Sequence, residues 1–235
     1  MKNYLSFGGG VNSVALHLLM IQEKKEFESV FVNHGADWPE TYEYFTYFNN
    51  WLRSENMQTV TELKPIVKRK KIDKQWNSLV EFCTDRNIIP QQYPRWCTGD
   101  WKRGPMYQYV KRPCFMHIGI DAGESDRAAL ATSRGIENRW LLIEYDIDRK
   151  GCKKIISDHG LEIPMKSGCY ICPFQKPGQW KELRTKHPDL FCKAENLERK
   201  SGRTFHSAKN LQAVIEANQY KLFEQDEYPP CECGL

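Results

Sequence analysis

The chain lacks a hydrophobic run long enough to cross a membrane. Its longest apolar stretch, residues 14–21, spans eight residues and is interrupted by His17, whereas a transmembrane helix needs about 20 apolar residues. The first residues lead directly into a short apolar-aromatic segment, without the basic, apolar and small-residue succession of a cleaved signal. We therefore expect no membrane partner and a cytoplasmic location.

The chain also has little net charge, no internal repeat and no Gly/Ser-rich linker. Thirty-four Lys and Arg against thirty Asp and Glu give a net charge of +4, which is too small to require a polyanionic partner. The basic run at residues 68–71 is interpreted as a solvated loop, with nucleic acid as the alternative partner. At 235 residues, we expect an α/β domain over 1–163 and a smaller helical, cysteine-containing part over 164–235, packed as one unit.

Cysteine, by contrast, is abundant. Nine cysteines are an odd number in a chain too large to need disulfide staples, so metal or thiol chemistry is the better interpretation. Cys169 and Cys172 form a C-x-x-C pair, a spacing that suits zinc or an iron–sulfur cluster. Other interpretations are a reversible dithiol, a structural zinc site completed by His159 or His187, and inert core thiols.

Strand-like and helix-like segments alternate over the first two thirds of the chain. Strands are predicted at residues 4–7, 29–33, 59–63, 115–119 and 140–144, and helices at 13–20, 40–53 and 73–84. This alternation predicts an open, mainly parallel five-stranded sheet with helices on both faces. Further helices are predicted at 178–186, 188–199 and 208–223.

Three consecutive glycines, Gly8 to Gly10, separate the first predicted strand from the first predicted helix. Glycines let the backbone approach a ligand closely, and the following helix offers unpaired N–H groups and a positive dipole end. The turn is therefore a candidate anion site at the carboxyl end of a parallel sheet, where open α/β folds bind ligands. A turn without a ligand is the alternative, since neither a Walker loop nor G-x-G-x-x-G is present.

Four stretches, in order, resemble the phosphoadenylyl-sulfate (PAPS) reductase family of the PP-loop, adenine nucleotide alpha hydrolase-like superfamily. Residues 6–13 are similar to its S-F-S-G-G-K-D-S loop, and residues 33–42 to its D-T-G-x-x-x-P-E-T-Y motif. Residues 95–105 resemble its cysteine, lysine and proline stretch, and residues 119–127 its G-x-R-x-x-E-S-x-x-R segment. The resemblance covers residues 3–175 and implies a sulfur-metabolism enzyme that binds an adenine nucleotide.

The resemblance also implies site residues. Lys102 and Arg127 would hold the anionic end of the nucleotide. The remaining nucleotide-binding residues that it implies are Ser6, Phe7, Gly8, Gly9, Gly10, Asn12, Ser13, Asn33, His34, Gly35, Asp37 and Glu124. Gly8, Val11 and Asn12 stand where the family's loop carries serine, lysine and aspartate, and Asn33 stands where the second motif often has aspartate.

By the same resemblance, Cys97 is the third ligand beside Cys169 and Cys172, and the expected cofactor is a [4Fe-4S] cluster, with zinc as the alternative. Trp96 occupies the first position of the family's tandem Cys-Cys, so a fourth ligand must come from elsewhere or be absent. Cys231 is the predicted fourth ligand, with Cys192 and Cys233 as other candidates.

Residues 231–235 resemble the family's E-C-G-[I/L]-H tail, whose cysteine attacks the sulfur of the sulfonucleotide. Cys233 is therefore a candidate nucleophile as well as a candidate ligand, with thioredoxin or a similar thiol as reductant. The leading hypothesis is PAPS or APS reduction by this oxidoreductase-like enzyme. One alternative is an AMP-forming sulfurtransferase that uses ATP and Mg to thiolate a nucleic acid or nucleobase. Another is a non-catalytic, zinc-binding module that senses nucleotides or associates with nucleic acid.

Overall fold

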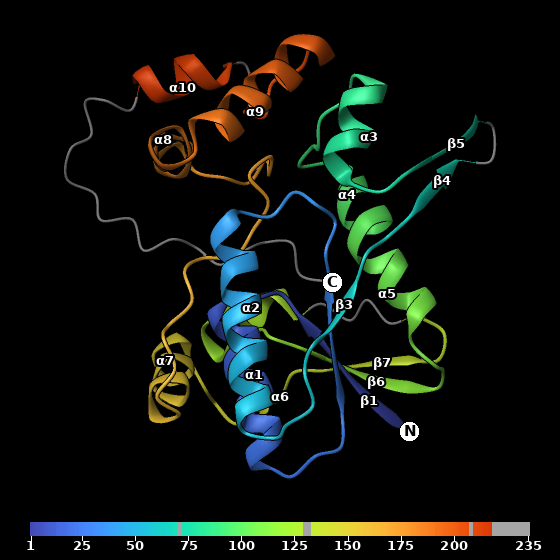
Figure 1. Cartoon of the computed structure of the whole chain (residues 1–235), viewed down its shortest axis with the longest axis vertical. Helices are drawn as coiled ribbons and strands as arrows, with labels where there is room; N and C mark the ends of the chain where they lie inside the picture. The colour runs from blue at the N-terminus through green and yellow to red at the C-terminus, as the bar shows by residue number, and fades with distance from the viewer. Residues whose placement is uncertain (70–71, 129–132, 207–208, 218–235) are drawn as a thin grey trace.

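The computed structural model describes residues 1–69, 72–128, 133–206 and 209–217 (Figure 1). A five-stranded sheet forms its centre, with the strand order β3-β2-β1-β6-β7 and all neighbouring pairs parallel. The open, parallel five-stranded sheet predicted from the sequence is therefore confirmed. Its strands are β1 (Lys2–Phe7), β2 (Glu28–Val32), β3 (Thr61–Leu63), β6 (Cys114–Ile118) and β7 (Ile136–Arg139).

The strand order reverses at β1, which has β2 on one side and β6 on the other. In an open α/β sheet, the connections from two such neighbours leave in opposite directions and open a crevice at the carboxyl ends of the strands. Here these ends are Phe7 of β1 and Ile118 of β6. The glycine turn follows Phe7, so it lies at this crevice.

Helices cover both faces of the sheet, as predicted. On one face, helices α1 (Val11–Gln22), α2 (Pro39–Ser54), α6 (Leu141–Glu144) and α7 (Arg149–Asp158) share a hydrophobic cluster with Leu5, Phe7 and Phe31. On the other, α5 (Gly104–Tyr109) packs Met106 against a cluster that includes Tyr4, Val30 and Met116. Alternate residues of β1 and β2 thus point to opposite layers, as the strand period requires.

Two predicted elements are wrong. Residues 140–144 form no strand, because Leu141–Glu144 is helix α6 and the fifth strand is β7, just before it. A short apolar run fits a buried strand or a buried helix equally well. The predicted helix at 73–84 divides into β5 (Ile72–Trp76) and α3 (Leu79–Arg86), whose first turn is capped by Ser78.

Strand β5 pairs antiparallel with β4 (Val67–Arg69) in a small hairpin. Lys68 and Arg69, interpreted as part of a loop, are thus exposed strand residues, and Lys70 and Lys71 lie outside the described residues. The Arg69 guanidinium lies 2.5 Å from a carboxylate oxygen of Asp100. Part of the positive charge of this run is therefore balanced within the chain.

After residue 164 the described chain contains helices α8 (Pro177–Lys186), α9 (Pro188–Ser201) and α10 (Leu211–Ala217), which Figure 1 shows at the end of the molecule near α3. Trp180 and Phe191 from these helices share a hydrophobic cluster with Trp38, Trp76 and Trp101. The cluster thus joins both sides of the predicted boundary at 163/164. In the described part of the chain, helices of the length and hydrophobicity that a bilayer requires are absent.

Residue 102 lies within an unusual helical segment. Helix α4 (Trp96–Thr98) continues without a break into a π-helical turn, η1 (Gly99–Arg103), and then into α5. A π-helical turn contains one residue more than an α-helical turn, and such turns are frequent at functional sites. The turn carries Lys102 and the buried Trp101.

We expect the stability of the fold to fall in mild acid because of His17. This side chain is 2% exposed on α1, and burial lowers its pKa to about 3. The unfolded chain protonates this histidine with a pKa of about 6.5. Below that pH the unfolded state therefore binds a proton that the folded state does not bind, and the free energy of unfolding decreases by about 1.4 kcal/mol per pH unit as the pH falls toward 3.

In the variant His17→Leu, the free energy of unfolding should depend less steeply on pH, by the slope that corresponds to about one proton. The measurement is urea unfolding at several values between pH 7 and 4.5. His117, whose pKa burial lowers to about 4, remains in the variant and supplies the residual slope. Parallel stability curves for the wild type and the variant would contradict the prediction.

Candidate functional site

The glycine turn leaves the backbone N–H groups at the beginning of α1 available to bind an anion. Gly9 has a φ of +72°, a conformation that L side chains rarely adopt, and Gly10 is the N-cap residue, with no side chain to bond the first N–H groups. The first turn of α1 contains no acidic residue. The backbone N–H groups and the positive end of the helix dipole therefore face the crevice without a carboxylate of that turn to compete for them.

A cavity of about 150 Å³ lies over this turn. Most of the predicted nucleotide-binding residues line it, namely Ser6, Phe7, Gly8, Gly10, Asn12, Ser13, Asp37, Lys102, Glu124 and Arg127. Gly9, Asn33, His34 and Gly35 are not among its lining residues. Apolar side chains complete the wall, including Phe31, Val32 and Ile118. Segments far apart in the sequence thus form one pocket with a polar and an apolar side.

Two further cations that the sequence analysis missed, Arg149 and Lys166, also line this cavity. Together with Lys102 and Arg127 they give four positive side chains against the carboxylates of Asp37 and Glu124. Lys166 lies three residues before Cys169 of the cysteine pair, which could have pointed to it, but nothing in the local sequence marks Arg149. The excess of positive charge favours an anionic ligand.

The two carboxylates in the cavity are paired with basic groups. Glu124 accepts a hydrogen bond of 2.5 Å from Nη1 of Arg127, within the 3₁₀ helix η2 (Ala122–Arg127). Oδ1 of Asp37 lies 3.9 Å from Nζ of Lys102. Each carboxylate therefore faces a cation at the wall of the cavity.

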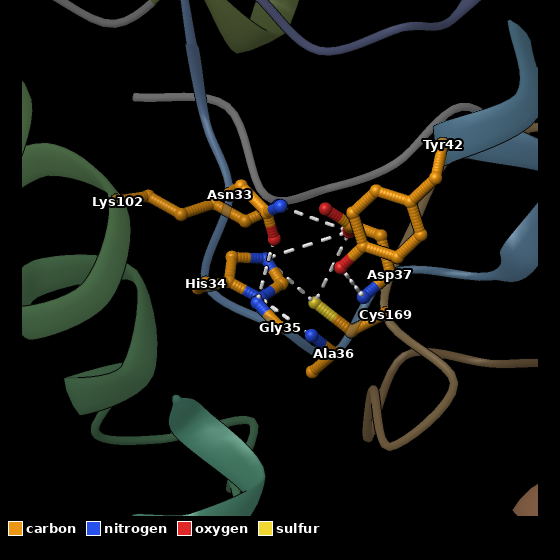
Figure 2. Close-up of polar contacts among 8 residues, drawn as sticks. All are labelled: Asn33, His34, Gly35, Ala36, Asp37, Tyr42, Lys102 and Cys169. Atoms are coloured by element: carbon orange, nitrogen blue, oxygen red, sulfur yellow. Dashed lines mark hydrogen bonds and ion pairs between the residues drawn. The ribbon is translucent and has the colours of Figure 1, made fainter. Parts of the chain in front are cut away.

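Asp37 also belongs to a buried triangle with His34 and Cys169, which Figure 2 shows converging from two segments. Nε2 of His34 lies 3.3 Å from Sγ of Cys169 and 3.4 Å from Oδ1 of Asp37, and the sulfur lies 3.7 Å from that oxygen. Burial alone would raise the pKa of Asp37, but the imidazole and the Lys102 ammonium overcome it and lower the pKa to about 2. Asp37 is therefore ionised at neutral pH.

The backbone decides which nitrogen of His34 carries the proton. The N–H of Ala36 donates to Nδ1 over 3.2 Å, so the neutral ring holds its hydrogen on Nε2. That N–H points toward Cys169 and Asp37. As arranged, His34 is thus a hydrogen-bond donor to the sulfur, whereas a metal ligand would need a lone pair on the same nitrogen.

Asn33 and Gly35 shape the turn that carries this triangle. Oδ1 of Asn33 accepts from the N–H of Gly35 over 3.0 Å, and its amide nitrogen donates to Glu62 over 2.6 Å. Gly35 has a φ of +73°. In this arrangement the amide of Asn33 serves the local turn, and its predicted contact with the nucleotide stays a prediction.

Cys97, Cys169 and Cys172 line a second, smaller cavity of about 20 Å³. The three thiols that the sequence analysis assigned to one site are thus brought together from two distant segments. Within the described residues, the group of potential ligands that lie within 4.8 Å of one another is His34, Asp37 and Cys169. Cys97 and Cys172 are therefore more widely spaced from this group than the ligands of a single ion.

Three other candidate ligands, Cys192, His159 and His187, do not line the thiol cavity. Cys192 is exposed on α9. His187 bonds Glu40 and His159 bonds the carbonyl of Ile155, and neither lines the thiol cavity, so the zinc site completed by these histidines is not supported. Cys231 and Cys233 lie outside the described residues.

The anion cavity and the thiol cavity are neighbours. Lys102 lines both of them, and Asp37, which lines the first, touches Cys169, which lines the second. Residues 166–168 line the first cavity immediately before Cys169. A ligand on the glycine turn would therefore lie beside the thiols.

Comparison with models of known protein families and with curated proteins found no match for this chain. The basis for a function is therefore the chemistry of these two cavities together with the motifs that they contain.

Proposed function

We propose that the protein is a sulfur-metabolism enzyme of the PAPS reductase type, which binds an adenine nucleotide on the glycine turn and transfers the sulfur of its sulfonate to a cysteine thiol. The observation that carries this proposal is the meeting of the two cavities at Lys102, with anion-binding groups on one side and three thiols on the other. Cleavage of a bond between a nucleotide and an anionic sulfur group needs the anion-binding groups and a thiol at the same place.

In this proposal the phosphate of the nucleotide rests on the backbone between Gly8 and Ser13, at the positive end of α1. The purine packs against the apolar wall that includes Phe31 and Ile118. Lys102 and Arg127 hold the sulfonate or phosphate oxygens, for which the planar fork of arginine is suited.

The thiol cavity supports an iron–sulfur centre through the type of its donors, three cysteines from two segments. Thiolates are soft ligands of the kind that iron–sulfur clusters use, and the three cysteines are not grouped as closely as the ligands of one ion. Cys97, Cys169 and Cys172 would hold a [4Fe-4S] cluster, with Cys231 as the predicted fourth ligand. When bound, the cluster would cross-link the two segments and order Lys102 between them. The cavity has about the size of one water molecule, so the segments would separate to admit the cluster.

Sulfur transfer can be written with a tail cysteine as nucleophile. The thiolate of Cys233 attacks the sulfonate sulfur; an S–S bond forms and the S–O bond breaks, and the leaving phosphate oxygen keeps the electron pair. One thiolate of an external dithiol such as thioredoxin then attacks Sγ of the enzyme S-sulfonate, which forms a mixed disulfide and releases sulfite. The second thiolate closes the disulfide of the dithiol and releases the Cys233 thiolate, and two thiol protons pass to solvent. The role of Cys233 rests on the resemblance of residues 231–235.

The pairing of the carboxylates favours a sulfonucleotide over ATP with Mg. Magnesium prefers carboxylate and phosphate oxygens in an octahedral arrangement. Glu124 is bonded to Arg127, Asp37 faces Lys102 and His34, and residue 12 of the loop is an asparagine. An ATP-dependent thiolation of a nucleic acid or nucleobase is therefore the second candidate.

The test uses full-length protein purified without oxygen. Mixed with PAPS and a thioredoxin system, it is expected to release sulfite and adenosine 3′,5′-bisphosphate, and adenine nucleotides should raise its melting temperature. The protein is expected to be brown and to contain iron and sulfide.

Three results would overturn the proposal in different ways. Formation of AMP and pyrophosphate from ATP, without sulfite from PAPS, would indicate the thiolation enzyme. Colourless protein with one zinc per chain and no turnover would indicate the binding module. Absence of any melting-temperature shift with PAPS, AMP or ATP would remove the basis of both enzymatic hypotheses.

A further inference from the structure

We propose that Arg149 is the phosphate-binding cation of the glycine turn, supplied by α7 in place of the lysine that the resembled loop carries at position 11. The proposal rests on the function proposed above. Arg149 is the first residue of α7, lines the anion cavity, and donates from Nη1 to Oδ1 of Asn12 over 2.8 Å. A residue remote in sequence thus reaches the second residue of α1.

The amide of Asn12 is held in one orientation from both sides. Its oxygen accepts from Arg149, and its nitrogen donates to Oδ2 of Asp121 over 2.9 Å. A flipped amide would place its NH₂ against the guanidinium and its oxygen against the carboxylate, so the orientation is unambiguous. Asn12 and Asp121 are 6% and 2% exposed, and an interaction in such surroundings is stronger than one in water.

The contacts of Asn12 with Arg149 and Asp121 explain why positions 11 and 12 of the loop differ from the S-F-S-G-G-K-D-S motif. Position 11 is a valine that is 1% exposed and packs into the hydrophobic cluster of α1 and α7, so the loop itself provides no cation there. Position 12 cannot be aspartate without placing its carboxylate against that of Asp121. An asparagine at this position can bond both the acidic and the basic neighbour.

The helix that carries Arg149 is also held in place by its N-cap and by its packing. Asp148 is the N-cap of α7 and accepts from the N–H of Gly151 over 2.8 Å, which fixes the start of the helix. Cys152 and Ile156 bury the same helix in the cluster that contains α1. The guanidinium has five N–H donors, and the bond from Nη1 to Asn12 orients the planar group at the cavity wall.

Isothermal titration with adenosine and with 5′-AMP separates phosphate binding from structural support. For Arg149→Gln, the affinity for AMP is expected to fall by about 10- to 100-fold, the effect of one charged hydrogen bond, while the affinity for adenosine stays within about twofold. Arg149→Lys should recover part of the AMP affinity. If Arg149→Gln weakens both ligands equally, or neither, Arg149 only ties α7 to α1 and the inference is wrong.

Failure of adenine-nucleotide binding, on which the proposed function rests, gives a different result, because wild-type protein would then bind neither adenosine nor AMP. A second measurement does not depend on folding of the variants. In the wild-type protein, AMP should protect Arg149 from phenylglyoxal, as followed by peptide mass spectrometry, and adenosine should not. Arg53, near the far end of α2, is the internal reference. Equal modification of Arg149 with and without AMP would also overturn the inference.

Discussion

Cys169→Ser is expected to abolish retention of the proposed iron–sulfur centre and, with it, the proposed sulfite formation. Serine offers a hard, protonated oxygen where a soft thiolate is needed. Cys169 is buried, lies beside Cys97 and Cys172, and is contacted by His34, so another side chain cannot easily take its place. The measurement is iron and sulfide content per chain, together with the visible absorption spectrum, after anaerobic purification.

The matched control is Cys192→Ser. Cys192 is exposed on α9 and does not line the thiol cavity, so this variant should keep the iron, the colour and the melting temperature of the wild type. Cys97→Ser and Cys172→Ser should lose the centre as Cys169→Ser does. Unchanged iron content in Cys169→Ser, or equal losses in Cys169→Ser and Cys192→Ser, would show that the cavity is not the metal site.

Gly119→Ala is expected to remove nucleotide binding and to destabilise the fold by about 1–3 kcal/mol, the usual range for overpacking. A Cβ at position 119 would lie 2.9 Å from the backbone nitrogen of Ser13 and 3.0 Å from the carbonyl carbon of Asn12. Both atoms belong to the first turn of α1, so the methyl group would push this turn away from the end of β6. The measurements are urea unfolding and titration with AMP.

Gly178→Ala is the control for this substitution. Nothing lies within 4 Å of a Cβ at position 178, which is in the first turn of α8 and does not line the cavity. Alanine should therefore leave AMP binding unchanged and keep or slightly raise stability, by up to about 1 kcal/mol. Wild-type affinity for AMP in Gly119→Ala would contradict the placement of the ligand on this turn.

The sheet could be predicted because its buried strands and covering helices alternate along the chain. The edge strand β7 was harder to predict. Strand β7 alternates buried Ile136 and Asn138 with exposed Glu137, a weak pattern, whereas the stronger apolar run beside it is the buried helix α6. Likewise, the β4–β5 hairpin has a polar sequence and depends on the packing of Trp76 against Phe82.

The site could be predicted where neighbouring residues form a motif. The glycine turn, Lys102, Arg127 and three of the cysteines lie in such stretches and line the two cavities, the cysteines being Cys97, Cys169 and Cys172. Arg149 could not be found in this way, because its function depends on the packing of α7 on α1 and on the single amide of Asn12. The donor role of His34 depends in the same way on the backbone of Ala36.

The π-helical turn η1 makes the position of Lys102 depend on the number of residues in this segment. Successive residues of an α-helix are rotated by about 100°, so shortening residues 99–103 by one would restore a regular helix and swing Lys102 away from its place between the two cavities. The sheet would be untouched by such a deletion. The length of residues 99–103, and not only the identity of residue 102, therefore determines whether a lysine lies at the junction of the two cavities.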